Sequence, residues 1–138
     1  FKNQVFSNFL ANIQLIADLL VERKIEFLTI TGQTSASVRQ QYSHLFNDSR
    51  QKYKVFLVST MAGNAGLNLY GANRVILMDV SWNPTNDTQA VYRAFRIGQE
   101  KANVYVYRLV MDQSPERTVY WRNILKETTA IEIIDKQT

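Results

Sequence analysis

The sequence predicts an α/β domain whose central, mostly parallel sheet is covered by helices on both faces. Two observations carry this prediction. Short apolar runs, which are typical of strands buried on both faces, alternate along the chain with longer segments of helical periodicity. The length of 138 residues and the hydrophobic content of 46% also fit one globular domain with a sizeable core. We therefore expect residues 1–138 to form a single domain.

The strands are expected where the apolar runs are densest, near residues 3–7, 26–30, 54–58, 74–79 and 104–109. The helices are expected near residues 9–24, 35–46, 85–96 and 115–126. In the first helix the apolar residues keep helical spacing, while Asp18 and Glu22 lie on the polar face. The third helix follows Pro84, a residue type favoured at the first helical position. Because strands and helices alternate, the strands should run parallel.

We expect His44 and two tyrosines, Tyr105 and Tyr107, to lie on the surface or to pack in the domain and not to bind a ligand. His44 is the only histidine and has no second metal ligand nearby in sequence, so we expect a surface or packing residue on the second helix. Tyr105 and Tyr107 alternate in the last strand, which we expect to be central in the sheet. They should therefore lie in the core or on a sheet face, and not form a base-stacking platform.

Composition narrows the class of protein. The chain has no cysteine, which excludes a disulfide framework and a thiolate metal site. No charged-then-apolar leader opens the chain and no apolar run is long enough to cross a bilayer, so we expect a soluble, intracellular domain without a membrane partner. Phe1 lies almost inside the first strand, which suggests a fragment of a longer protein. The net charge of +4 favours a polyanionic partner, though only weakly.

The most informative segment is Gln89–Gln99, which places Arg93 and Arg96 three residues apart near the end of the third helix. On a helix this spacing points both side chains the same way. A guanidinium is permanently charged and directs two donors at phosphate oxygens, so such a pair suits the charge of a transferring phosphoryl group. A solvated helix face or a salt-bridge pair is the alternative.

Two loops upstream have the residue types of ligand-binding loops. The apolar run Val55–Val58 leads into Ser59–Leu69, which is rich in hydroxyl groups and glycine. A second apolar run, Arg74–Asp79, leads into Ser81–Pro84. Ligands of open parallel sheets lie outside the carboxyl ends of the strands. We therefore expect this one edge of the sheet to collect all the candidate chemistry.

Together these segments resemble the second motor lobe of the Swi/Snf-type chromatin-remodelling ATPases, within superfamily two of the helicases and translocases. The segments that match are Val5–Phe9, Thr31–Ser35 with Arg39–Gln40, Phe46–Asp48, Ser59–Leu69, Trp82–Pro84 and Gln89–Gln99. The Arg-Ile-Gly-Gln ending, with Trp-Asn-Pro before it, is characteristic of remodellers and not of helicases at large.

Two residues depart from the family pattern. Met61 stands where most members have arginine or lysine, which removes one basic contact to nucleic acid but leaves the backbone amides. Asn64 stands where they have a second glycine, and asparagine tolerates the left-handed backbone that glycine supplies.

The resemblance implies a RecA-like three-layer sandwich, the second lobe of a P-loop NTPase-like motor. Such a motor translocates on double-stranded DNA and remodels nucleosomes or other protein–DNA complexes in the nucleus. ATP with Mg²⁺ would be held mainly by a first RecA-like lobe, because this sequence lacks the Gly-Lys-Ser/Thr loop and the paired acidic residues. Arg93 and Arg96 would act as catalytic arginine fingers across the cleft, and the chain alone would be inactive.

The resemblance also assigns roles to further residues. Those expected to contact the nucleotide are Gly66, Asn68, Gln89, Arg93 and Arg96. Those expected to contact nucleic acid are Gly32, Gln33, Thr34, Ser59, Thr60, Met61, Ala62, Gly63, Trp82 and Asn83. Thr60 would offer a hydroxyl group and neighbouring amides to a phosphate, while Gly63 and Gly66 let the backbone approach closely. No metal ligand is expected in this chain.

Simpler roles exist for several of these residues. Thr34 or Ser35 could only cap the second helix, although capping and phosphate binding are compatible. The loop from residue 59 could be only a tight strand-to-helix turn. Trp82 could be a packing residue. Gln89 and Gln99 could cap a helix or face water.

Two other functions also stay open. The first is the lobe of a strand-separating DNA or RNA helicase, against which the Trp-Asn-Pro and Arg-Ile-Gly-Gln motifs argue. The second is a non-catalytic module that binds DNA or a partner. The paired arginines argue against it, because a module that never met ATP would have no physical need for them.

Overall fold

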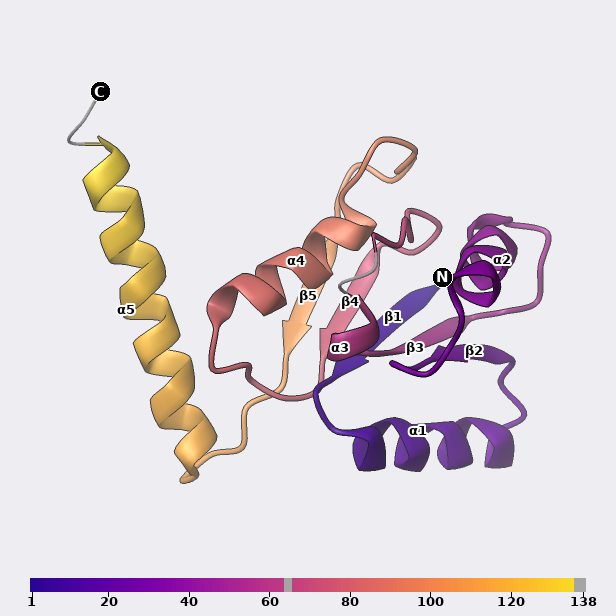
Figure 1. The fold of residues 1–138 in the computed structure, drawn as a ribbon, viewed down its shortest axis with the longest axis horizontal. Helices are drawn as coiled ribbons and strands as arrows, with labels where there is room; N and C mark the ends of the chain where they lie inside the picture. The colour runs from indigo at the N-terminus through magenta and orange to yellow at the C-terminus, as the bar shows by residue number, and fades with distance from the viewer. Residues whose placement is uncertain (64–65, 136–138) are drawn as a thin grey trace.

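A computed structural model describes residues 1–63 and 66–135. Five parallel strands form one sheet in the order β2-β3-β1-β4-β5 (Figure 1). The strands are β1 Asn3–Ser7, β2 Phe27–Ile30, β3 Val55–Ser59, β4 Arg74–Leu77 and β5 Tyr105–Arg108. The helices are α1 Leu10–Glu22, α2 Ala36–Asn47, α3 Thr60–Gly63, α4 Pro84–Ala94 and α5 Pro115–Asp135.

Helices cover both faces of the sheet. On one face α1 packs through Ile13 in a cluster with buried strand residues such as Leu57. On the other face a larger core contains Phe46 of α2, Ala62 of α3 and Ala90 of α4. Figure 1 shows α1 on one side of the strands, and α2, α3 and α4 on the other. The predicted parallel sheet with helices on both faces is confirmed.

The central strand β1 fixes the alignment of its neighbours. Val5 lies opposite Leu57 of β3 on one side and Ile76 of β4 on the other. Because all the strands point the same way, their carboxyl ends meet at one edge, which we call the carboxyl edge. The helices run back from it, so a residue at the end of a helix lies toward the opposite edge.

The helix boundaries differ from the expected ones in three places. The segment Thr60–Gly63 forms one helical turn where a loop was expected. The fourth helix, α4, ends at Ala94, two residues before the expected residue 96. The last helix, α5, continues to Asp135 and not only to 126, since the intervening sequence contains no glycine or proline to end it.

The expected central position of the last strand was wrong. Among the described strands, β5 lies at the edge of the sheet and pairs only with β4. Tyr105 and Tyr107 are 47% and 48% exposed, while Val104 and Val106 pack against the larger core. The tyrosines therefore lie on a sheet face and not in the core. His44 is exposed, as a surface residue should be.

The first half of α5 is tied to the loop between β4 and α4, because Asn123 donates a hydrogen bond to the Ser81 carbonyl. Val119 and Asn123 are buried on its inner side, whereas Trp121 is 54% exposed. Figure 1 shows the later turns of α5 extending away from the other helices. Within the described ranges, neither α5 nor any other helix is both long and apolar enough to cross a membrane.

Candidate functional site

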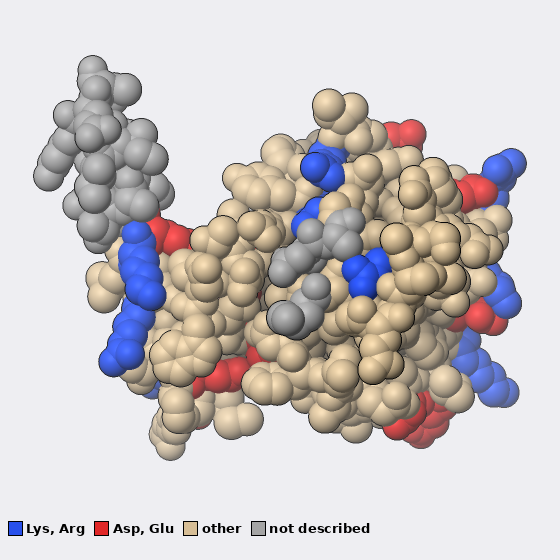
Figure 2. All heavy atoms as spheres, viewed as in Figure 1, with Lys and Arg blue, Asp and Glu red and all other residues tan. Residues whose placement is uncertain are grey.

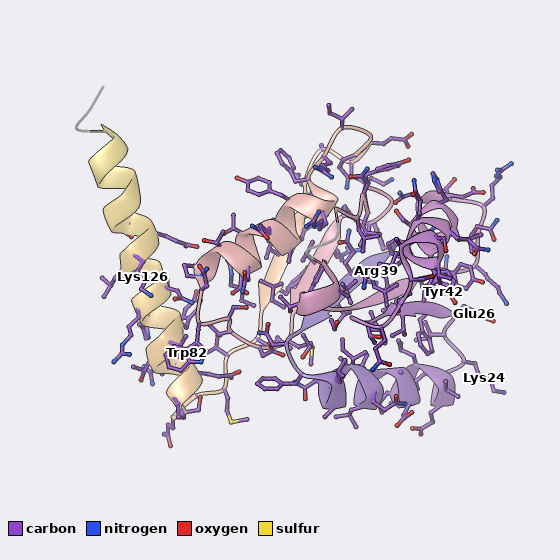
Figure 3. The ribbon with its side chains drawn as sticks, in the orientation of Figure 1. Lys24, Glu26, Arg39, Tyr42, Trp82 and Lys126 are labelled. Atoms are coloured by element: carbon purple, nitrogen blue, oxygen red, sulfur yellow. The ribbon has the colours of Figure 1, made fainter. Side chains whose placement is uncertain are left out.

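The loop between β4 and α4 presents an exposed indole. Asn83 caps α4, since its Oδ1 accepts a hydrogen bond from the Thr85 N–H at 3.1 Å, and Pro84 follows at the start of the helix. Trp82, immediately before the cap, is 75% exposed and lies next to α5 in Figure 3. Packing in the core therefore does not explain Trp82. A large side chain with apolar area and one N–H donor is left free for a ligand.

One guanidinium, that of Arg39 in α2, joins the loops that follow β2 and β3 (Figure 3). Its Nε donates to the Thr34 carbonyl at 2.7 Å, and its Nη2 donates to the Thr31 and Gly32 carbonyls at 3.1 and 3.0 Å. Its Nη1 donates to the Ala62 carbonyl at 3.2 Å. Only the planar five-donor guanidinium can serve four carbonyls in this way. Arg39 lies in one of the segments that match the family, but the sequence alone predicts no role for it.

The loop after β2 has the capping contacts considered as a simpler role. Thr34 Oγ1 accepts from the Thr31 N–H at 3.0 Å, and Ser35 Oγ accepts from the Val38 N–H at 3.4 Å. Gly32 and Gln33 are exposed, and a Cβ on Gly32 would meet nothing within 4 Å. The tip of this loop is therefore accessible, while its hydroxyl groups hold its shape.

The loop after β3 divides into buried and accessible residues. Ser59 and Ala62 are buried, and Ser59 Oγ accepts from the Ala62 N–H at 3.4 Å, so both side chains belong to the core side of the turn. Thr60 is partly exposed. Met61 and Gly63 belong to the backbone of α3, and the candidate turn residue Asn64 lies outside the described residues.

A buried carboxylate organises the carboxyl edge between β1 and β4. Asp79 is 6% exposed and accepts hydrogen bonds from the Ser7 hydroxyl group, the Asn8 side-chain amide and, at 2.9 Å, the Asn8 N–H. These bonds satisfy a charge that would otherwise be costly to bury. Sequence analysis placed Asp79 at the end of a strand and gave it no role. The signal available was an acidic residue closing an otherwise apolar run.

Ser81, next to the exposed Trp82, forms hydrogen bonds with α4, with α5 and with the loop between β1 and α1. Asn123 of α5 donates to the Ser81 carbonyl at 2.7 Å, and Asn8 donates to the Ser81 hydroxyl group at 3.2 Å. Asp87 of α4 accepts hydrogen bonds from Ser81, which favour its charged form, but burial outweighs them and raises the pKa of Asp87. In the described part of the chain, no group of three or more histidine, cysteine or acidic residues could hold a metal ion.

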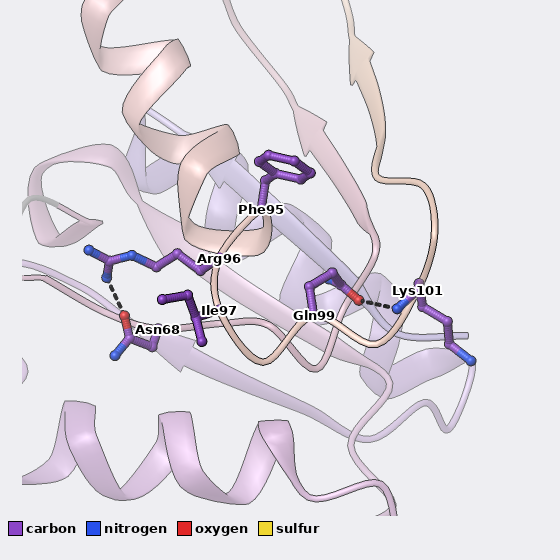
Figure 4. A pocket seen from close by; sticks show the side chains of 6 residues that line it. All are labelled: Asn68, Phe95, Arg96, Ile97, Gln99 and Lys101. Atoms are coloured by element: carbon purple, nitrogen blue, oxygen red, sulfur yellow. Dashed lines mark hydrogen bonds between the residues drawn. The ribbon is translucent and has the colours of Figure 1, made fainter.

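The two arginines lie apart from this edge. Arg93 is in the last turn of α4, but the helix ends at Ala94, so Arg96 belongs to the following turn. The expectation that both arginines project from one helix was wrong. Figure 4 shows Arg96 reaching Asn68, whose Oδ1 accepts a hydrogen bond from Arg96 Nη1. Gln99 then donates to the Ala72 carbonyl at 2.8 Å, near the start of β4. The candidate chemistry is thus divided between two places, because α4 runs back from the carboxyl edge.

The arginine pair carries an unbalanced positive charge. Burial and the neighbouring charge of Arg96 lower the pKa of Arg93. Within the described residues, neither guanidinium forms an ion pair with a carboxylate. An open hollow beside them is lined by Asn68, Phe95, Arg96, Ile97, Gln99 and Lys101 (Figure 4). This arrangement suits an anion that approaches from outside the domain.

The turn after Arg96 depends on a glycine and a glutamine. Gly98 has φ of +104°, and a Cβ there would lie 3.1 Å from the Tyr70 ring, so both conformation and space favour glycine. Gln99 Nε2 also donates to the Ala94 carbonyl at 3.1 Å, which makes it a structural residue of the turn.

Two further candidates for contacts to the nucleotide lie outside this turn. Gln89 is exposed on α4. Gly66, in the candidate loop after β3, has φ of +72°, a conformation that favours glycine.

Residues 2–98 match the family described as the helicase conserved C-terminal domain. Protein CHROMATIN REMODELING 25 of Arabidopsis thaliana is 45% identical over 88% of this chain and 13% of its own length. DNA repair and recombination protein RAD54 of Oryza sativa subsp. japonica is 44% identical over 88% of this chain and 12% of its own length. Transcriptional regulator ATRX of Homo sapiens is 39% identical over 83% of this chain and 5% of its own length. The chain therefore spans a small part of these curated relatives.

A solved structure shows the same fold. The crystal structure of the C-terminal part of the Fun30 ATPase domain superposes with a TM-score of 0.81 at 34% sequence identity. The match covers 87% of this chain and 38% of that one. The three-layer arrangement is thus that of a RecA-like ATPase lobe.

The raised pKa of Asp87 predicts a pH-dependent stability. A group whose folded-state pKa is raised holds its proton more firmly in the folded state, so stability falls as pH rises from the ordinary aspartate range through the folded pKa. We expect wild type to lose stability relative to Asp87→Asn across this window, measured by urea unfolding at a series of pH values. Asp48→Asn is the control with the opposite sign, since hydrogen bonds from Arg50 lower the pKa of Asp48. A constant difference between wild type and Asp87→Asn would contradict the prediction.

Arg39→Ala should destabilise the domain by about 1–3 kcal/mol, because four carbonyls lose their shared donor. Arg39→Lys should recover only part of this, since one ammonium group cannot reach both loops. Denaturant unfolding of the chain measures both changes. Arg23→Ala, an exposed arginine at the end of α1, is the control and should stay within about 0.5 kcal/mol of wild type. Equal stability of Arg39→Ala and Arg23→Ala would contradict the claim that Arg39 stabilises the two loops.

Proposed function

Because the chain belongs to the helicase conserved C-terminal domain family and is similar to the Swi/Snf-type remodelling ATPases, we propose a function for it as part of a motor. In this proposal it is the second motor lobe of an ATP-dependent translocase on duplex DNA. The observation that carries the proposal is the pair of guanidiniums left without a carboxylate partner in the described residues. In this proposal the motor remodels nucleosomes or other protein–DNA complexes in the nucleus.

The nucleotide would lie between this lobe and a first RecA-like lobe that supplies the phosphate loop and the Mg²⁺ ligands. ATP provides the phosphoryl group whose charge grows during transfer. The donor set here fits phosphate oxygens, because Arg93 and Arg96 offer forked N–H donors and no carboxylate of the described residues pairs with them. Asn68 would hold Arg96 in reach until the cleft closes. Gly66 and Gln89 are further candidates for contacts around the nucleotide.

The surroundings of the arginines support a partner lobe on this side. Phe95 and Ile97, which flank Arg96, are 62% and 101% exposed, and Tyr92 one turn earlier is 57% exposed. Apolar side chains around a charged centre are typical of a surface that is covered in the working assembly. A first lobe docking here would exclude water and strengthen the attraction between guanidinium and phosphate.

Duplex DNA would lie along the carboxyl edge. Gly32 to Thr34 and Thr60 are the accessible residues of the two loops that Arg39 joins, and they offer amides and hydroxyl groups for phosphate contacts. Trp82 and Asn83 extend this surface toward α5. Closing and opening of the cleft would then move these contacts along the duplex.

ATP hydrolysis by the full-length parent tests the proposal directly. We expect stimulation by duplex DNA and by nucleosomes to exceed that by single-stranded DNA or RNA, because the proposed contacts are to phosphates of a duplex. A preference for RNA or single strands would favour a strand-separating helicase. The absence of hydrolysis with any nucleic acid would favour a binding module without catalysis.

Arg96→Ala in the full-length parent should reduce ATP turnover by about 10³-fold or more, as expected for the loss of an arginine finger. Affinity for duplex DNA should stay close to that of wild type, because Arg96 lies away from the carboxyl edge. Steady-state ATPase and equilibrium DNA binding measure the two effects, with Arg23→Ala as the surface control. Normal turnover in Arg96→Ala would show that Arg96 is no finger.

A further inference from the structure

We infer that helix α5 carries a second contact to the DNA backbone, made by Arg122 and Lys126. This inference rests on the proposed function, since it extends the proposed DNA surface beyond the loops of the sheet. The partner it fits is the phosphate backbone of the same duplex that meets Trp82.

The first step is the charge on α5. Arg122 and Lys126 are exposed and four residues apart, so they lie on one side of the helix about 6 Å apart along its axis. In the described residues neither forms an ion pair, whereas Arg117 is neutralised by Asp112 at 2.8 Å. Figure 2 shows Lys and Arg side chains in blue along α5 on the side that it displays, and Figure 3 labels Lys126 on this helix. These two positive charges are available to an anion.

The second step is the fixed position of this charge. Asn123, next to Arg122 in sequence, is 6% exposed and donates to the Ser81 carbonyl at 2.7 Å. Ser81 immediately precedes the exposed Trp82, so one hydrogen bond ties α5 to the loop that we propose to meet DNA. Val119, one turn before Asn123, is buried and adds an apolar anchor. The basic pair is therefore held at a set position beside Trp82.

The third step is the match to a polyanion. Phosphates recur every 3.4 Å of helix axis along each strand of a duplex, so two cations about 6 Å apart on flexible side chains can each meet a phosphate of one strand. Lysine and arginine on a helix surface make such contacts without reading sequence. A contact of this kind suits a motor that moves along DNA, because every phosphate is equivalent.

The test compares two pairs of neutralising substitutions in the full-length parent. Arg122→Gln with Lys126→Gln removes the α5 charges, and Arg23→Gln with Lys24→Gln removes two exposed charges at the far end of α1 (Figure 3). Binding to a short free duplex is measured by fluorescence anisotropy over a series of salt concentrations. Each lost phosphate contact lowers the slope of log affinity against log salt by about 0.9. We expect a loss of about 1.8 for the α5 pair and no change for the α1 pair.

Equal slopes for the two pairs would overturn the inference. So would an α5 effect on nucleosome binding without one on free duplex, because the partner would then be a protein surface. The Asn123 anchor is tested by repeating the α5 comparison in a parent that also carries Asn123→Ala. The change in salt slope caused by the α5 pair should be smaller in this background. An unchanged difference would contradict the claim that Asn123 holds the basic pair in position. Circular dichroism of each variant confirms that the parent remains folded.

This outcome is separate from that of the proposed function. A parent whose ATPase ignores duplex DNA contradicts the proposed function, whatever the α5 pair does. A parent that is stimulated by duplex, but whose α5 and α1 pairs behave alike, contradicts only the contact on α5.

Discussion

The short segment Leu67–Leu69 is the connection on which the whole candidate site depends. Leu67 and Leu69 are buried in the larger core. Between them, the Asn68 carbonyl accepts hydrogen bonds from Ser43 and Asn47 of α2 at 2.6 and 2.8 Å. The Leu69 N–H donates to the Arg93 carbonyl of α4 at 3.0 Å. One segment therefore sets the distance between α2, which carries Arg39, and the end of α4, which carries the arginine pair.

This connection explains how two separate places can work as one lobe. The loops at the carboxyl edge are joined by Arg39, and the segment that leaves the second of them ends in contact with both arginines. Close-packed elements of this kind move together and do not deform gradually. In the proposed motor, a shift of the lobe that brings Arg93 and Arg96 to a nucleotide would therefore also displace the loops proposed to hold DNA. Coupling between the two ligands needs no further device within this domain.

Sequence reasoning reached the fold and the loops, but not their relation in space. Strand periodicity and the motif segments located β1 to β4 and the residues around Thr60 and Trp82, because these patterns are local. The edge position of β5 and the separation of Arg96 from the carboxyl edge depend on strand order and helix direction, which local patterns do not encode. The hydrogen bond from Arg39 to the Ala62 carbonyl and the hydrogen bonds to Asp79 join residues distant in sequence. A lone arginine or aspartate in the sequence could not reveal those partners.

The treatment of charge argues that the arginine pair is kept for a ligand and not for stability. Where this domain uses a charge for its own structure, it supplies hydrogen-bond partners: the buried Asp79 accepts from Ser7 and Asn8, and the partly exposed Arg39 donates to four carbonyls. Arg93 is also partly buried and is repelled by Arg96, yet no acidic side chain among the described residues forms an ion pair with it. Such an arrangement costs folding free energy, because burial and the neighbouring charge of Arg96 both disfavour the charged form of Arg93. The unpaired arginines are explained if a phosphate group from outside the lobe supplies the negative charge that balances them.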